Sequence, residues 1–288
     1  MASSHEFPFA VSLQYSSTGS ASNRQHLCGG ALIGANYVLT AAHCFYDNNG
    51  NLDSASNWVV VAGSSNNNVC ANSGWVKSSS CNYAQVKTIN VHPSYNSRTV
   101  KNDIAILELS TSITIDGTNT KIAYIESGSV PVNSNFNVLV AGWGYYSTSE
   151  VVSTALRKVV IPVVQPSVCN ALSLAMSSPM QVCAGYDSHD ACSGDSGGPL
   201  FRSLNNSTSD WALIGIVSYG PDTVCGADAT TRGVYTNTTY FLNSFIKPLV
   251  SSVKLSAYDP SGTYFTNSIG VTASVNVIVL VASLLILL

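Results

Sequence analysis

Short runs of β-branched and other apolar residues recur along the first 250 residues, and Gly, Asn, Ser and Pro gather between them. Apolar runs of this length, bounded by turn-forming residues, are typical of β-strands. The pattern predicts strands within residues 9–15, 30–42, 57–63, 103–109, 136–144, 158–164 and 212–220. Because no alternation of strand and helix patterns indicates βαβ units, we expect an antiparallel all-β barrel or sandwich.

One helix is predicted at the end of this region, within residues 237–250. Phe241 and Phe245 lie at helical spacing there, and Thr238 or Thr239 is placed to cap the first turn. No internal repeat of fixed period is found.

The chain changes character at about Ser251. Residues 251–270 are rich in Ser, Thr and Gly without a clear period, and they are interpreted as a stalk. Residues 271–288 form a hydrophobic tail with no basic residue after it. This run is short for a spanning helix, and its layout is that of a GPI-attachment signal, with Ser268 as the preferred attachment site and Ser261 as the second choice. A plain transmembrane tail and an extension without function stay open as alternatives.

Charged residues make up only 9% of the chain, against about 25% in a typical soluble domain, and the formal net charge is −3. Such a chain offers no basic face to a phosphate backbone, so no nucleic-acid partner is expected. The eight cysteines include no CxxC pair, which favours four disulfides over a zinc site and therefore an oxidising compartment. Three N-x-S/T sequons agree with a secreted or cell-surface glycoprotein, at Asn205, Asn206 and Asn237.

One serine, Ser196, stands between an aspartate and two glycines, a setting that suggests a nucleophile. A serine hydroxyl is a weak nucleophile until a base removes its proton. His43 is the best candidate base, because it follows a strand-like run that ends in small residues and has a cysteine beside it. Asp103, at the head of an apolar run, suits a buried carboxylate that orients a neutral imidazole. His26 and His92 are expected to be structural.

Seven short motifs around these residues follow one another along the chain: LTAAHC, NDIAIL, GWG, VCAGY, GDSGGPL, GIVSYG and GVYTN. In this order they resemble the trypsin/chymotrypsin family of serine proteases, over about Glu6 to Val250. The resemblance implies two antiparallel six-stranded β-barrels with a C-terminal helix, in a protease domain at residues 1–250. It also implies a serine endopeptidase that needs no cofactor.

The resemblance gives each matching residue a role. His43 resembles the general base, Asp103 the acid that orients it, and Ser196 the nucleophile that forms an acyl-enzyme. The backbone N–H groups of Gly194 and Ser196 resemble an oxyanion hole. Asp195 resembles the acid that forms a buried ion pair with a new α-amino group, once a propeptide has been cut before an Ile/Val-Val-Gly-Gly start.

The first residues of the sequence lack two features that this resemblance leads us to expect. Residues 1–14 contain neither the basic nor the apolar region of a signal peptide, and no Ile-Val-Gly-Gly start is present. A short part of the mature enzyme is therefore expected to be missing. Either the true start codon lies upstream, or the short chain is real and is held in a zymogen-like state. The chain as it stands is expected to have very low activity.

The resemblance also implies three disulfides, Cys28–Cys44, Cys169–Cys183 and Cys192–Cys225, and the two cysteines that remain, Cys70 and Cys81, would pair by elimination. The first would brace the histidine loop, and the third would brace the specificity pocket. The segment between Cys70 and Cys81 has no place on the usual family pattern. Because Glu and Asp are absent from residues 66–102, where the family's calcium-binding loop would lie, no metal site is expected.

An acid six residues before the nucleophile is found in trypsin-like members of the family, and here that position is Asp190. The other expected pocket residues are Ser218, Tyr219, Gly220 and Gly233. A carboxylate at the bottom of a partly desolvated slot selects a cationic group, so we expect cleavage after Arg and Lys. Ala191 replaces the serine that is common beside this acid, which favours Arg because a guanidinium still binds the carboxylate in bidentate fashion.

Two other functions stay open. A catalytically weak or inactive homologue would use the same fold as a surface binding or adhesion protein, although the chain keeps all three triad residues. A different acyl hydrolase would have a G-x-S-x-G elbow, which residues 194–198 match, but α/β-hydrolases place the histidine last, whereas His43 comes first. The expected partners are Arg- or Lys-containing protein or peptide substrates, protein inhibitors, and a membrane through the tail. The protease domain is expected to be a monomer.

Overall fold

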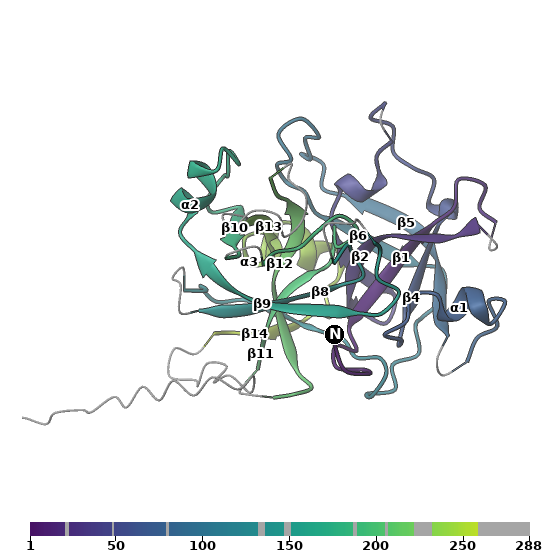
Figure 1. Ribbon diagram of the computed structural model, residues 1–288. Helices are drawn as coiled ribbons and strands as arrows, with labels where there is room; N and C mark the ends of the chain where they lie inside the picture. Colours follow the sequence, from purple (N-terminus) through teal and green to yellow (C-terminus); the bar gives the residue numbers. More distant parts are fainter. Residues whose placement is uncertain are drawn as a thin grey trace, which may run out of the picture.

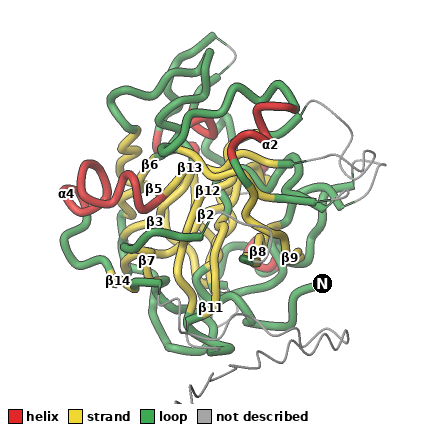
Figure 2. Tube along the Cα trace, turned by 90° about the vertical axis from the view of Figure 1, so that its left-hand side faces the viewer, coloured by secondary structure: helices red, strands yellow, loops and turns green. Residues whose placement is uncertain are grey.

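Two β-barrels stand side by side in the computed structural model, and short helices lie at their periphery (Figures 1 and 2). The structure describes residues 1–20, 23–47, 49–78, 81–131, 136–146, 151–186, 189–204, 207–221 and 232–258. Each barrel is built from six strands, so the predicted architecture of two antiparallel six-stranded barrels is confirmed.

The first barrel closes in the order β1-β2-β3-β6-β5-β4, and every neighbouring pair is antiparallel. Its strands are β1 (Ala10–Tyr15), β2 (Gln25–Gly34), β3 (Tyr37–Thr40), β4 (Trp58–Ala62), β5 (Asn82–Val91) and β6 (Ala105–Leu109). A turn at Ala35 and Asn36 separates β2 from β3, so the single run predicted at residues 30–42 contains parts of two strands.

The second barrel runs β11-β8-β9-β10-β13-β12 and closes through the pairing of β11 with β12. Its strands are β8 (Asn137–Gly142), β9 (Arg157–Val164), β10 (Gln181–Ala184), β11 (Pro199–Ser203), β12 (Trp211–Tyr219) and β13 (Gly233–Asn237). Two short strands, β7 (Tyr124–Glu126) and β14 (Lys254–Ser256), extend the sheet in parallel from β12.

An aromatic cluster joins the two barrels. Phe7 and Phe9 precede β1, and both rings meet Phe201 of β11 edge to face, with centroids 4.9 and 5.0 Å apart. Phe7 also meets Trp211 of β12 at 5.1 Å, and all four side chains are buried. Edge-to-face pairs of this kind add to the stabilisation that burial of the rings provides. The N-terminal segment of the first barrel is thereby held against the second.

The helices are all short. They are α1 (Val69–Asn72), α2 (Pro166–Ala171) and a C-terminal helix made of α3 (Thr238–Phe241), a π-helical turn (Leu242–Ile246) and α4 (Lys247–Leu249), together with 3₁₀ turns at His43–Phe45 and Ala55–Asn57. The C-terminal helix is confirmed, but its cap is Asn237 and not Thr238 or Thr239. The Asn237 Oδ1 atom accepts hydrogen bonds from the backbone N–H groups of Thr239 (3.0 Å) and Tyr240 (3.4 Å).

The capping role of Asn237 bears on its sequon. Its Nδ2 atom donates to the carbonyl oxygen of Pro179 (2.9 Å), so the nitrogen that would carry a glycan already makes a contact of the fold. The two other sequon residues, Asn205 and Asn206, lie outside the described residues.

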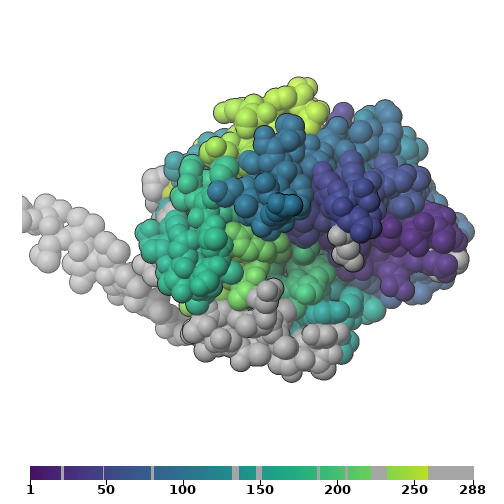
Figure 3. Space-filling model, turned by 90° about the horizontal axis from the view of Figure 1, so that it is seen from above, coloured from purple at the N-terminus to yellow at the C-terminus, as the bar shows by residue number. Residues whose placement is uncertain are grey.

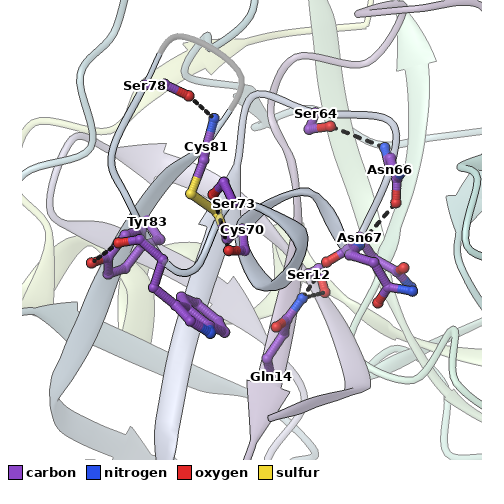
Figure 4. Close-up of a disulfide and its surroundings, with 12 residues drawn as sticks. Ser12, Gln14, Ser64, Asn66, Asn67, Cys70, Ser73, Ser78, Cys81 and Tyr83 are labelled. Carbon is purple, nitrogen blue, oxygen red and sulfur yellow. Dashed lines mark hydrogen bonds between the residues drawn. A yellow bond between two sulfur atoms is a disulfide. The ribbon is translucent and has the colours of Figure 1, made fainter. Parts of the chain in front are cut away.

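Three disulfides lie within the described residues, and they join the same cysteines that the sequence pairs: Cys28–Cys44, Cys70–Cys81 and Cys169–Cys183. Cys192 is also disulfide-bonded, and Cys225, its expected partner, lies outside the described residues. Figure 4 shows the Cys70–Cys81 bond beneath the loop that follows α1. Tyr83 closes this loop from β5, because its hydroxyl donates to the carbonyl oxygen of Trp75 (2.8 Å).

Buried Glu126 fixes the C-terminal segment to the second barrel. Its Oε2 atom lies 2.6 Å from Nη2 of Arg202, which comes from β11. Its Oε1 atom accepts from the backbone N–H groups of Gly128 (2.9 Å) and Tyr258 (2.8 Å). The carboxylate is fully enclosed, and Arg202 is only 11% exposed. One buried charge therefore connects β7, β11 and the segment that follows β14.

The expected stalk does not begin at Ser251, because residues 254–256 form β14 and pair with β7. The rest of the predicted stalk, the tail at residues 271–288 and the predicted anchor site Ser268 lie outside the described residues. Within the described ranges, the helices are too short or too polar to cross a lipid bilayer.

We expect Glu126→Gln to lower the free energy of unfolding by about 3–5 kcal/mol, because it leaves the buried guanidinium of Arg202 without its counter-charge. Urea unfolding at pH 7 measures this cost. Glu108→Gln is the matched control, since Glu108 pairs with Lys87 at the surface and its loss should change stability little. Equal unfolding midpoints for the two variants would contradict the prediction.

Candidate active site

Asp103 and His43 form a buried pair where the two barrels meet. Asp103 precedes β6 and is 1% exposed. Its Oδ1 atom accepts from the backbone N–H of His43, and its Oδ2 atom lies 2.8 Å from His43 Nδ1. From the second barrel, the hydroxyl of Ser218 donates to Oδ2 (2.5 Å) and that of Thr236 donates to the Asp103 carbonyl oxygen (2.8 Å). Donors from both barrels therefore satisfy this acid.

The environment of His43 prepares it to accept a proton. Burial alone lowers the pKa of His43, but the charge of Asp103 and its hydrogen bond outweigh burial, so the pKa is raised. Because an ionised carboxylate only accepts hydrogen bonds, Nδ1 of a neutral His43 carries the proton and Nε2 keeps its lone pair. The side chain is 27% exposed, so part of the ring is open to solvent.

The turn that carries Ser196 is fixed between the same two barrels. The carbonyl oxygen of Ser196 accepts from the N–H of Gly29 in β2 (2.7 Å), and the N–H of Gly197 donates to Val217 in β12 (2.9 Å). Gly29 in turn accepts from the hydroxyl of Thr40, three residues before His43. The Ser196 turn and the His43 segment therefore share backbone neighbours. The Ser196 hydroxyl makes no hydrogen bond within the described residues.

His26 is a site neighbour that sequence reasoning assigned only a structural role. Its Nε2 atom lies 2.8 Å from the carbonyl oxygen of Gly194, and its Nδ1 atom lies 2.8 Å from the Ser12 hydroxyl. Burial lowers the pKa of His26 to about 4, so the ring is neutral at pH 7. Since a carbonyl oxygen can only accept, Nε2 carries the proton and Nδ1 accepts from Ser12. No local motif marks this residue, because its partner Gly194 is 168 positions away.

Gly194 needs a backbone conformation that other residues avoid. Its φ is +92°, a region that L-amino acids with a side chain rarely adopt. Gly194 accepts the hydrogen bond from His26 on one side and leads into the turn of Ser196 on the other. The predicted oxyanion-hole residue is thus held in a shape that favours glycine.

Asp195 lines a cavity of about 200 Å³ together with Met1, Gly142, Gly144 and Asp190. Its carboxylate accepts from the backbone N–H groups of Gly144 (2.8 Å) and Cys192 (2.9 Å). Burial raises the pKa of Asp195 to about 6, and these two hydrogen bonds oppose that rise only in part.

Two of the predicted pocket residues, Gly220 and Gly233, lie beside Asp190. The Tyr235 hydroxyl donates to its Oδ1 atom (2.6 Å), as does the N–H of Ala191 (2.7 Å). A Cβ at Gly233 would lie 2.5 Å from that oxygen, so only glycine fits there, and a Cβ at Gly220 would lie 3.9 Å from Oδ2. Burial raises the pKa of Asp190 to about 7. We call the space in front of this carboxylate the Asp190 slot.

Of the remaining expected pocket residues, Ser218 binds Asp103 through its hydroxyl and Tyr219 turns away from the slot. The Tyr219 hydroxyl donates to the carbonyl oxygen of Leu174 (2.9 Å). Ser218 therefore supports the His43–Asp103 pair. The position of Ser218 in the GIVSYG motif does not by itself indicate this contact.

Comparison with known proteins agrees with these geometries. The family model for trypsin matches residues 1–245. Transmembrane protease serine 11G of Rattus norvegicus is 32% identical over 247 residues, which cover 84% of this chain and 52% of that protein. Chymotrypsin-C of Bos taurus is 32% identical, over 88% of this chain and 82% of that protein. Chymotrypsin-like elastase family member 1 of Homo sapiens is 34% identical, over 74% and 78%. The chain spans about half the length of the 11G relatives.

The raised pKa of Asp195 predicts how an Asp195→Asn variant responds to pH. The folded-state pKa is about 6 against an ordinary 3.8, so the protonated acid stabilises the fold below about pH 4 and that contribution is lost as the pH rises through 6. Asparagine does not titrate. We therefore expect the stability of Asp195→Asn, relative to the unaltered protein, to improve by about 3 kcal/mol between pH 4 and pH 8.

Urea unfolding at pH 4, 6 and 8 measures this change. Glu108→Gln is the control of opposite sign, because the hydrogen bond from Lys87 lowers the pKa of Glu108 and its removal should cost more as the pH rises. A stability difference for Asp195→Asn that is flat with pH would show that Asp195 is already fully ionised or already paired.

Proposed function

Because the chain belongs to the trypsin family of serine proteases, we propose that it is a serine endopeptidase in which Ser196, His43 and Asp103 act together. The observation that supports this most directly is the buried Asp103–His43 pair, next to a turn that fixes Ser196 between the barrels. Such a pair holds the imidazole in the one tautomer that can take a proton from a serine hydroxyl.

In the proposed reaction, Nε2 of His43 takes the proton of the Ser196 hydroxyl while the oxygen attacks the peptide carbonyl carbon. The imidazolium then gives this proton to the leaving amine, and an acyl-enzyme remains on Ser196. Water, activated by the same imidazole, hydrolyses the ester. The Ser196–His43 hydrogen bond must form for this step, and in enzymes of this kind it often tightens only when substrate binds.

The negative charge that develops on the attacked oxygen needs donors that are already in place. We assign this role to the backbone N–H groups of Gly194 and Ser196. The φ of Gly194 and the hydrogen bond from His26 to its carbonyl oxygen support the assignment, because they restrict how this peptide unit can rotate. His26 would act as a positioning residue and would not touch substrate.

For specificity we propose cleavage after Arg, and less well after Lys. The relatives of this chain include proteins named chymotrypsin-C and chymotrypsin-like elastase, so the relatives alone do not indicate cleavage after Arg. The proposal therefore rests on Asp190. Gly220 and Gly233 have no side chains to fill the slot, so a long cationic side chain of the substrate has room to reach the Asp190 carboxylate. Ala191 offers no hydroxyl to a lysine ammonium, whereas a guanidinium reaches the carboxylate with two donors.

We also propose that the cavity beside Asp195 receives a free α-amino group, as in the family that the chain resembles. The carboxylate has two backbone donors and a raised pKa, and a cation in this cavity would lower that pKa. Such pairing would fix the peptide units on either side of Asp195, including that of Gly194.

The proposed setting is extracellular, because disulfides persist in oxidising compartments, and two of the relatives are named transmembrane proteases. Proposed partners are proteins or peptides with Arg or Lys at the cleaved position. Protein inhibitors and a membrane anchor at Ser268 stay predictions from the sequence.

The first experiment is labelling with a fluorophosphonate, in the full chain and in a form whose Ile-Val-Gly-Gly start is exposed by proteolysis. We expect the second form to label faster, because it supplies the α-amino group. Ser196→Ala should abolish labelling and lower kcat/KM at least about a thousandfold. Ser193→Ala, three residues earlier in the same turn, is the matched control and should label normally. If neither form labels or cleaves, the chain is a non-catalytic homologue and the proposal is wrong.

A second experiment tests the Asp190 slot with paired Arg and Lys peptides. We expect kcat/KM for Arg to exceed that for Lys, and Asp190→Ser to lower the Arg value about a hundredfold. Because burial raises the pKa of Asp190 to about 7, the carboxyl is neutral below that pH, and KM for Arg peptides should fall as the pH rises through 7. Equal or faster cleavage after Lys would contradict the Arg preference. Full Arg activity in Asp190→Ser would contradict the slot assignment.

A further inference from the structure

A second hollow of about 690 Å³ lies next to the Asp190 slot. Three segments line it, residues 98–101 before β6, residues 172–175 after α2, and residues 219–221 at the end of β12. In Figure 3 the blue loop before β6 lies beside the teal segment around α2, at the face turned to the viewer. Gly220 belongs to this hollow and also borders the slot, so the two are continuous. We call the hollow the cationic groove.

The walls of the groove adopt an unusual backbone. In the part of the chain that the structure describes, six non-glycine residues have positive φ. Four of them lie in or beside the groove: Val100 (49°), Asn102 (55°), Ser173 (61°) and Ala175 (42°). For a β-branched residue such as Val100 this conformation is strained. Strain of this kind persists only where the surroundings enforce it, and it gathers at functional sites.

Side-chain hydrogen bonds enforce this backbone. Gln181 donates to the carbonyl oxygen of Val100 (3.4 Å), Asn102 donates to that of Ser94 (2.8 Å), and the Tyr219 hydroxyl donates to that of Leu174 (2.9 Å). The last bond ties two walls of the groove together. Hydrogen bonds within the protein therefore hold the walls of the groove in this conformation.

Two cations at the rim distinguish this groove from the rest of the surface. The protein has 12 Lys and Arg residues, all of them within the described ranges. Nine of the others have an ion pair, a hydrogen bond or an aromatic ring at the head group. The tenth, Arg232, interacts through its charge with Asp190. Among the described residues, Arg98 and Lys101 have no such partner at the head group, and both are exposed and line the groove. No Asp or Glu occurs between Asp53 and Asp103 to neutralise them from their own segment.

We propose that the cationic groove selects substrates that carry Asp or Glu about two to four residues before the cleaved bond, a distance that an extended chain spans from the slot. The inference rests on the proposed endopeptidase function. The stem of such a side chain would lie along Val100 and Tyr219, and its carboxylate would reach Arg98 or Lys101. The substrate side chain that these two cations select is negatively charged, whereas the substrate side chain in the slot is a positively charged arginine.

The test uses peptides with the best-cleaved residue at the cleavage point and Glu, Gln or Lys at each of the three preceding positions. Exposed ion pairs contribute little individually, so we expect Glu to exceed Gln in kcat/KM by about three- to tenfold at the best position. Lys should fall below Gln. The preference should shrink when salt rises from about 0.05 to 0.5 M, because the charges are open to solvent.

The double variant Arg98→Gln/Lys101→Gln should cleave the Glu and Gln peptides at equal rates. Lys87→Gln is the matched control, since Lys87 of β5 pairs with Glu108 of β6, and it should keep the preference. If the unaltered protein cleaves Gln and Glu peptides equally, or if the double variant keeps the preference, the groove inference is wrong while the protease proposal stands. If no peptide of the set is cleaved, the proposed function itself fails.

Discussion

The placement of the two barrels depends on the buried carboxylate of Asp103. An ionised acid at 1% exposure is costly unless every oxygen finds donors, and these come from His43 on one side and from Ser218 on the other. A shift of either barrel would leave the charge unsatisfied. Besides the aromatic cluster, the two barrels are therefore held together by the same interaction that orients the imidazole and raises its pKa.

The buried acids around the His43–Asp103 pair fall into two groups, which differ in whether a guanidinium is bound to the carboxylate. Asp190 and Asp195 are both held where burial raises the pKa, so each is prepared to gain from a cation that arrives from outside. Glu126, by contrast, already has Arg202 and serves the fold. Within the described residues, Asp190 and Asp195 accept hydrogen bonds from a tyrosine hydroxyl and backbone N–H groups, and the charge of Arg232 lowers the pKa of Asp190 only in part. Glu126, which secures the C-terminal segment, is paired directly with a guanidinium.

Much of this could be predicted from the sequence, and the exceptions have physical reasons. Apolar runs located β1, β4, β6, β8 and β12, because both faces of those strands are largely buried. They also located β9, in which only Ile161 and Val163 are buried. The runs missed β5, where Gln, Lys and Thr alternate with apolar residues, and β11, which begins at Pro199. They also missed β7, β10, β13 and β14, which are only three to five residues long. Motifs located His43, Asp103, Ser196 and Asp190. They could not locate His26 or the cationic groove, since those depend on contacts between segments such as Gly194 and His26, 168 residues apart.

The anchoring of the C-terminal segment by Glu126 also governs how the molecule would be oriented if held from that end. Tyr258 is fixed beside β14, and Figures 1 and 2 place β14 on the opposite side of the molecule from α2, which flanks the groove. A tether joined after Tyr258 would leave on the far side and direct the groove outward. Its reach would then determine which substrates are accessible, and proteins free in solution or on a facing surface would be reached before neighbours on the same surface.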